Sequence, residues 1–183
     1  MWFSDLTALI SLYGVKTRRA AGMQALVVLL SLLPAAVHAE VIIGRVASIV
    51  DGDTLTLADA SNQLHRIRLF GIDAPEITQD FGQRAKTDLS ALASNQQASA
   101  DCRPADRSSS ALCVVRVGVQ DIGLELIRNG AAWLYPPHNA QLSAKERADY
   151  AQAEFMAKIH RYGLWNSKNP TPPWDWRRGR PDE

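Results

Sequence analysis

Residues 41–72 read VIIGRVASIVDGDTLTLADASNQLHRIRLFGI, and this stretch decides the fold class. It holds three runs rich in Val, Ile, Leu and Thr, the composition that favours β-strands. Asp51-Gly52 is a strong hairpin signal, and the polar residues 59–62 mark a second turn. The expected strands span residues 41–50, 54–58 and 64–72. The segment therefore predicts three consecutive antiparallel strands.

Downstream of this segment the chain changes to helical patterns. Residues 85–92 place Ala85, Leu89 and Leu92 on one face of a helix, and residues 112–119 supply a further strand. Strands followed by helices, rather than alternating with them, imply an α+β fold with an antiparallel sheet.

Capping residues define two more helices. Asp121 is a natural N-cap for a helix over residues 122–128, and Gly130 is a natural C-cap. Ser143 opens a second helix, because Glu146 three residues later completes a capping box. The C-terminal third is therefore expected to be helical.

The C-terminal segment, residues 167–183, is rich in Pro, Trp and Arg. Its prolines predict an extended tail. We expect Trp174 and Trp176 to pack back on the domain, because two large rings bury much apolar area. Its arginines form the only dense basic cluster of the sequence after residue 39, which we interpret as a solvated end. The prolines are Pro170, Pro172 and Pro173, and the arginines are Arg177, Arg178 and Arg180.

The N-terminal 39 residues have the layout of a signal peptide. Basic residues precede an apolar run over residues 25–33, and small side chains at Val37 and Ala39 suit cleavage after Ala39. The protein is then periplasmic or secreted. The alternative is an inner-membrane anchor through residues 25–39, although the apolar run is shorter than the roughly 20 residues that span a bilayer. Met1 and Met23 both remain candidate starts.

Composition limits the class of protein. The chain has 183 residues, 46% of them hydrophobic and 21% charged, which is typical of one soluble domain. Without residues 1–39 it has 17 Lys and Arg against 18 Asp and Glu, a net charge of −1. Bulk positive charge therefore cannot bind nucleic acid, and any such binding needs a local basic site.

Two cysteines, Cys102 and Cys113, lie in the part of the chain expected to be exported. Oxidising compartments allow such a pair to form a disulfide. The two residues flank a polar stretch, as two neighbouring strands joined by a loop would place them. A disulfide is the leading interpretation, and two buried thiols are the alternative.

Three carboxylates stand at the ends of the predicted strands. They are Asp53, Asp73 and Glu76, and hard oxygen ligands of this kind suit calcium or magnesium. Clustered carboxylates repel one another unless a cation lies among them. Pro75 biases Ala74 towards extended geometry, so the backbone carbonyl of Ala74 is a further candidate ligand.

These residues form a pattern that resembles the staphylococcal nuclease, or thermonuclease-like, family. The pattern is the sequence Asp-Gly-Asp-Thr over residues 51–54, then Arg68 five residues before Asp73, then Pro75-Glu76. Further similarities run to Trp165. The resemblance implies a five-stranded OB-like β-barrel with three helices, in a thermonuclease-like domain over residues 40–166.

The resemblance also implies the chemistry. Asp53, Asp73 and the carbonyl of Ala74 match metal ligands, with calcium as the first choice of cation. Glu76 matches the residue that activates water and belongs to the metal site, and Arg68 matches a phosphate-binding arginine. The implied enzyme is an endonuclease that hydrolyses phosphodiester bonds in DNA, RNA or both, as a monomer with no membrane span after cleavage.

One departure from the family pattern affects the expected rate. Ser110 stands where many members carry a second catalytic arginine, and losing such a group costs about two to three orders of magnitude. The enzyme is therefore expected to be slow, with Arg103, Arg107 and Arg116 as candidate replacements. The alternative functions are an inactive OB-like module that binds nucleic acid, and an envelope interaction domain that binds partners through residues 170–178.

Overall fold

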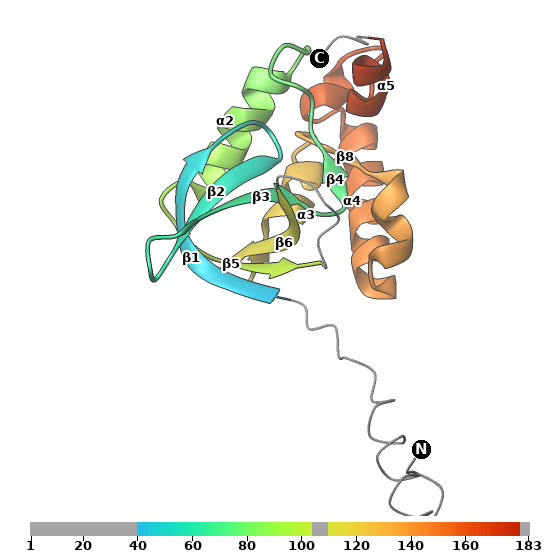
Figure 1. Ribbon diagram of the computed structural model, residues 1–183. Helices are drawn as coiled ribbons and strands as arrows, with labels where there is room; N and C mark the ends of the chain where they lie inside the picture. The colour runs from blue at the N-terminus through green and yellow to red at the C-terminus, as the bar shows by residue number, and fades with distance from the viewer. Residues whose placement is uncertain (1–39, 104–109, 180–183) are drawn as a thin grey trace, which may run out of the picture. The chain divides into compact units, whose positions relative to one another are not determined.

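Five strands of the computed structural model close into a barrel (Figure 1). The structure describes residues 40–103 and 110–179. The strands are β1 (Glu40–Ile49), β2 (Thr54–Asp59), β3 (Leu64–Leu69), β5 (Gln97–Cys102) and β6 (Ala111–Val117). Antiparallel neighbours follow the order β3-β2-β1-β5-β6, and a parallel pairing of β3 with β6 closes the ring. The predicted α+β fold with a five-stranded barrel is confirmed.

The barrel core follows the two-residue alternation of its strands. Leu55 and Leu57 on β2, and Ile67 and Leu69 on β3, are buried, whereas Arg68 between the last two is partly exposed. Successive side chains of a strand point to opposite faces, so the same strand supplies both core and surface. Burying each of these aliphatic side chains contributes roughly 1.5–3 kcal/mol.

The expected strand over residues 64–72 is wrong at its C-terminal end. It breaks after β3 at Gly71, which has a φ of 85°, and resumes as β4 (Ile72–Asp73). Glycine adopts this left-handed conformation without a steric penalty. Because of the turn, β4 does not continue β3 but pairs with β8 (Trp133–Leu134). Asp73 therefore belongs to a different sheet from β3.

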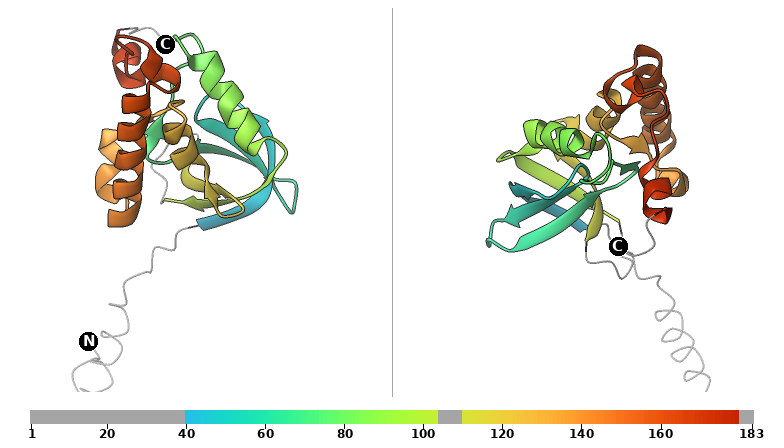
Figure 2. Two further views of the ribbon diagram at one scale, coloured as in Figure 1. Left: turned by 180° about the vertical axis from the view of Figure 1, so that it is seen from behind. Right: turned by 90° about the horizontal axis from the view of Figure 1, so that it is seen from above.

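Three helices form at the predicted places. They are α2 (Gly82–Ala93), α3 (Ile122–Arg128) and α4 (Ala144–His160). Asp121 caps α3 by accepting from the N–H of Leu124, and Ser143 and Glu146 form both bonds of the capping box of α4. Helix α3 contacts α2, α4 and β6, so the helices form one layer beside the barrel (Figure 2).

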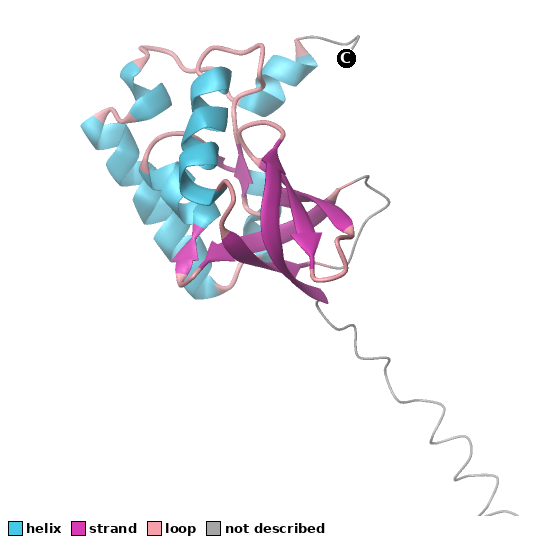
Figure 3. Cartoon of the chain, turned by 90° about the vertical axis from the view of Figure 1, so that its left-hand side faces the viewer, coloured by secondary structure: helices cyan, strands magenta, loops and turns pink. Residues whose placement is uncertain are grey.

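Two elements differ from the expectations. The strand β5 was not among the expected segments, although its alternate residues Ala98, Ala100 and Cys102 are buried. The tail is not extended throughout, because residues Pro173–Arg178 form the short helix α5 (Figure 3). Proline suits the first turn of a helix, where its missing N–H has no role. The remaining short elements are β7 (Gln120–Asp121), η1 (Pro136–Gln141) and η2 (Gly163–Asn166).

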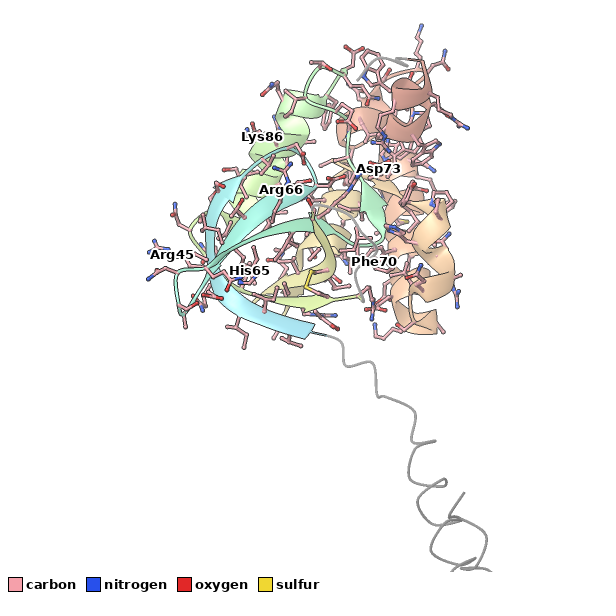
Figure 4. All side chains as sticks on the ribbon, viewed as in Figure 1. Arg45, His65, Arg66, Phe70, Asp73 and Lys86 are labelled. Atoms are coloured by element: carbon pink, nitrogen blue, oxygen red, sulfur yellow. A yellow bond between two sulfur atoms is a disulfide. The ribbon has the colours of Figure 1, made fainter. Side chains whose placement is uncertain are left out.

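A disulfide joins Cys102 to Cys113 across the β5–β6 pair, where the two residues are in register (Figure 4). The proposed signal peptide, residues 1–39, lies outside the described residues. Within the described ranges, none of the helices combines the length and apolar character that a bilayer span requires.

Candidate active site

The turn between β1 and β2 fixes the first carboxylate. The backbone N–H of Asp53 donates to Asp51 Oδ1 at 3.0 Å, and its carbonyl accepts from the N–H of Leu69 at 2.8 Å. A Cβ atom on Gly52 would lie 2.7 Å from Cβ of Ala74, so only glycine allows this close approach. Asp53 is consequently held beside the end of β3 with 5% of its surface exposed.

The second carboxylate is positioned by the glycine turn that starts β4. The N–H of Gly71 donates to His138 Nδ1 at 3.2 Å, and a Cβ at this glycine would lie 3.0 Å from the ring of Tyr150. Asp73 follows two residues later and pairs with Trp133 in the β4–β8 ladder. Its side chain is fully buried, where the barrel meets the helices (Figure 4).

Arg68 joins the two aspartates. Its Nη2 atom lies 2.7 Å from Asp73 Oδ1 and 3.3 Å from Asp53 Oδ2. Asp53 Oδ2, which contacts Arg68, also accepts from the backbone N–H of Ala74 at 3.1 Å. The other oxygen, Asp53 Oδ1, accepts from the hydroxyl of Thr54 at 3.0 Å. The structure thus brings together Asp53, Arg68, Asp73 and Ala74, as the sequence predicted.

Arg177 of α5 is a site residue that the sequence reasoning missed. Its Nη2 lies 2.6 Å from Asp73 Oδ2, and its Nη1 lies 3.2 Å from Asp73 Oδ1 and 2.6 Å from Glu76 Oε1. Glu76 therefore joins the site through this guanidinium. The interpretation of Arg177 as part of a solvated end was wrong, because the tail folds back and places the side chain on two carboxylates.

Contacts along the tail explain this position. The carbonyl of Thr171 accepts from Gln79 Nε2 at 2.6 Å, and Pro173 is buried. The ring of Trp174 lies 5.8 Å from that of Trp133 and 5.7 Å from that of Tyr135, in the tilted and edge-on geometries that aromatic pairs favour. These contacts hold α5 against the domain.

The site opens into a cavity of about 240 Å³. Its wall is almost entirely polar and mixes carboxylates with guanidinium groups, which suits a ligand that is itself charged. The lining residues are Asp51, Asp53, Thr54, Arg66, Arg68, Ala74, Pro75, Glu76 and Ser110.

Burial and charge shift the protonation of the site in opposite directions. Burial raises the pKa of Asp53 above its usual range, since desolvation outweighs the opposing charge of Arg68. Burial alone would lower the pKa of Arg68, but the charges of Asp53 and Asp73 more than offset it and raise that pKa. Hydrogen bonds to Asp73, and then to Glu76, raise the pKa of Arg177. Both guanidinium groups are therefore permanently charged.

The donor chemistry of the site fits a hard divalent cation. Asp53 and Asp73 are buried oxygen donors, and a buried carboxylate is costly unless a positive charge compensates it. Arginines supply that charge in this structure, and over the described ranges no three acidic, histidine or cysteine side chains gather in a metal-binding cluster. A cation would be held by Asp53, Asp73 and the carbonyl of Ala74, together with Glu76, whose Oε1 contacts Arg177.

The other arginines considered as replacements are placed differently. The guanidinium of Arg103 lies over the ring of Phe70, 5.1 Å from its centroid, and Arg116 pairs with Glu146 at 3.8 Å. Arg107 lies outside the described residues. Ser110 lines the cavity, so the position at which the resemblance expects an arginine lies at the site.

Comparisons with known proteins agree with this geometry. The family model of staphylococcal nuclease homologues matches residues 66–167, which include Arg68, Asp73 and Glu76. A Haemophilus influenzae protein named as an uncharacterized endonuclease is 38% identical over 134 residues, covering 73% of this chain and 72% of its own length. The micrococcal nuclease of Shigella flexneri is 34% identical over 148 residues, covering 74% and 80%. The fold, the site and these similarities together show that the chain belongs to the staphylococcal nuclease family.

Proposed function

We propose that the chain is an endonuclease that hydrolyses phosphodiester bonds in DNA, RNA or both with a divalent cation, for which calcium is our first choice. One observation carries the proposal. Arg68 bridges two buried aspartates, Asp53 and Asp73, at a polar cavity whose wall also contains Glu76. A module that only bound nucleic acid would not need acidic side chains where the phosphate must lie.

Each residue has a role that follows from its position. Glu76 is partly exposed at the cavity wall, where its carboxylate can orient and deprotonate an attacking water. Arg68 presents a guanidinium that stabilises the negative charge gathering on the phosphoryl oxygens. Asp53 and Asp73 would hold the cation, whose chemistry when bound is to neutralise the scissile phosphate.

The proposed rate is modest. Ser110 contributes no positive charge to the wall that it lines, so Arg68 is the only arginine matched to the family pattern. Removing a donor that stabilises the transition state costs about 10²- to 10³-fold in kcat. We therefore propose slower hydrolysis than that of a relative with two matched arginines.

We further propose that the protein acts outside the cytoplasm as a monomer. The signal-like sequence of residues 1–39 supports export, and so does the disulfide, since such bonds persist in oxidising compartments. Sequencing the N-terminus of protein isolated from the periplasm or medium should find Glu40 first. A chain that retains residues 25–39 would instead support the anchored form.

The test is incubation of the purified protein with DNA and with RNA, with and without calcium. Cleavage that requires the cation and is lost in Asp53→Ala supports the proposal. Cleavage that a chelator leaves unchanged contradicts it. Binding of nucleic acid without cleavage under any divalent cation would support the binding-module alternative.

A further inference from the structure

We propose that Arg177 is a second phosphate-binding residue of the active site, supplied by the C-terminal helix α5. This inference rests on the proposed function and extends it to a residue outside the matched family segment. The observation is the fork that Arg177 makes on Asp73 and Glu76, with contacts of 2.6, 3.2 and 2.6 Å. Ordinary charge pairing on a solvated tail would not reach a fully buried carboxylate.

The shape of the fork suits phosphate. A guanidinium presents parallel N–H groups that match two oxygens of a carboxylate or of a phosphate equally well. In this structure Nη1 and Nη2 of Arg177 contact both oxygens of Asp73, and Nη1 also contacts Glu76. The fork can therefore bind two phosphoryl oxygens with the hydrogen-bond geometry that it now uses for Asp73.

The location places the fork beside the reacting centre. Arg68 and Arg177 both contact Asp73, and each arginine side chain is 38% exposed. Glu76, which Arg177 contacts, lines the same cavity as Arg68 and Ser110. Arg177 does not itself line the cavity, but a phosphate bound there by Arg68 would lie beside Glu76, which Arg177 already contacts.

Charge explains how Arg177 becomes available. Two guanidinium groups now compensate the buried charge of Asp73. With a divalent cation on Asp53 and Asp73 that compensation is no longer needed, and the like charge of the cation disfavours a guanidinium on the same oxygens. The phosphate is then the anion left without a partner, and the proposal requires the Arg177 side chain to turn from these carboxylates towards it.

The packing of α5 argues against a removable inhibitory plug. The helix is held by the Gln79–Thr171 hydrogen bond, by buried Pro173 and by Trp174 against Trp133. Displacing the helix would expose these apolar surfaces, whereas turning the arginine leaves them in place. Arg177 is thus a resident of the site, and its backbone does not have to leave for substrate to bind.

The first test measures phosphate binding without any need for catalysis. The probe is a 5′-phosphorylated deoxythymidine trinucleotide, titrated by calorimetry into the full protein with calcium present. Arg177→Ala should weaken binding by about 10- to 100-fold, the usual effect of losing a charged hydrogen bond to an anion. The matched control is Arg178→Ala, because Arg178 pairs with Asp175 on the same helix, and it should change affinity by less than twofold.

The second test separates a catalytic role from a structural one. Arg177→Ala should lower kcat by about 10²- to 10³-fold, at a Tm that is unchanged when it is measured in calcium. Arg177→Lys should keep part of the rate. Added guanidinium ion at a non-denaturing concentration should restore part of the lost rate of the alanine variant. A merely structural arginine would show no rescue.

Three results would overturn the inference. The first is unchanged trinucleotide binding in Arg177→Ala. The second is a higher kcat in that variant, which would indicate an inhibitory contact. The third is an equal loss of trinucleotide affinity in Arg177→Ala and Arg178→Ala. If the unmodified protein cleaves nothing, the proposed function fails. The calorimetric comparison still decides whether Arg177 binds phosphate.

Discussion

Removing the hydroxyl of Tyr150 tests how the helical layer positions the site. Tyr150 is 1% exposed, and its hydroxyl lies 3.1 Å from both carboxylate oxygens of Asp121, the N-cap of α3. Its ring packs against the turn at Gly71 from which Asp73 follows. Tyr150→Phe keeps this ring and leaves the partly buried carboxylate of Asp121 with one partner fewer. The expected loss of unfolding free energy is about 1.5–3 kcal/mol, typical of a hydrogen bond to a charged group.

The loss should depend on pH with a defined sign. Burial raises the pKa of Asp121, and the Tyr150 hydroxyl opposes this shift by stabilising the ionised form. The hydroxyl therefore matters most when Asp121 is ionised, and the deficit of Tyr150→Phe should shrink as the pH falls from neutral through that raised pKa.

Thermal unfolding at pH 7 and pH 4 measures both effects. At about 3 °C per kcal/mol for a domain of this size, Tm should fall by roughly 4 to 9 °C at pH 7 and by less at pH 4. Tyr162→Phe is the control, since Tyr162 is half exposed, and it should shift the unfolding free energy by less than about 0.5 kcal/mol. An unchanged Tm at pH 7, or equal deficits at both pH values, would refute the reasoning.

Three further predictions concern the barrel and the site. Thiol titration of the unfolded, unreduced protein should find no free thiol, and replacing Cys102 and Cys113 by serine should cost roughly 3 kcal/mol in the chain-entropy model, as measured by denaturant unfolding. Gly52→Ala should destabilise the protein by about 1–3 kcal/mol, because the added methyl group would overlap Ala74, just after β4, and Ala85 of α2, and an unchanged midpoint would contradict this packing. Arg68→Ala should abolish cleavage, and Ser110→Arg should raise kcat at unchanged metal affinity, whereas a fully active Arg68→Ala would refute the role of that arginine.

Local sequence patterns were sufficient to predict most of the barrel and the helices. Alternating apolar residues and the Asp51-Gly52 turn locate β1 and β2, and the capping box at Ser143 locates α4, because each signal depends on neighbours a few residues apart. The pattern that contains Asp53 and Asp73 likewise predicted that these two carboxylates come together.

What the sequence did not reveal depends on long-range contacts. Strand β5 lacks the β-branched residues that mark its neighbours, and it is a strand because β1 and β6 pair with it on both sides. Arg177 was missed because its partners Asp73 and Glu76 lie about a hundred residues away along the chain. The dense arginine cluster after Trp174 and Trp176 was the available signal, since an aromatic pair that packs on the domain also fixes the arginines that follow it.

The proposed role of Glu76 in cation-dependent cleavage is tested most directly by measuring cleavage of labelled DNA and RNA oligonucleotides. The unmodified protein, Glu76→Gln and Asp80→Asn are compared, each in calcium and in a chelator. Asp80 is an exposed carboxylate four residues from Glu76 and serves as the matched control. The account predicts calcium-dependent cleavage by the unmodified protein and by Asp80→Asn, with a loss of at least about 10²-fold in Glu76→Gln, the usual contribution of a general base. Cleavage that persists in the chelator, or a Glu76→Gln variant as fast as Asp80→Asn, would contradict it.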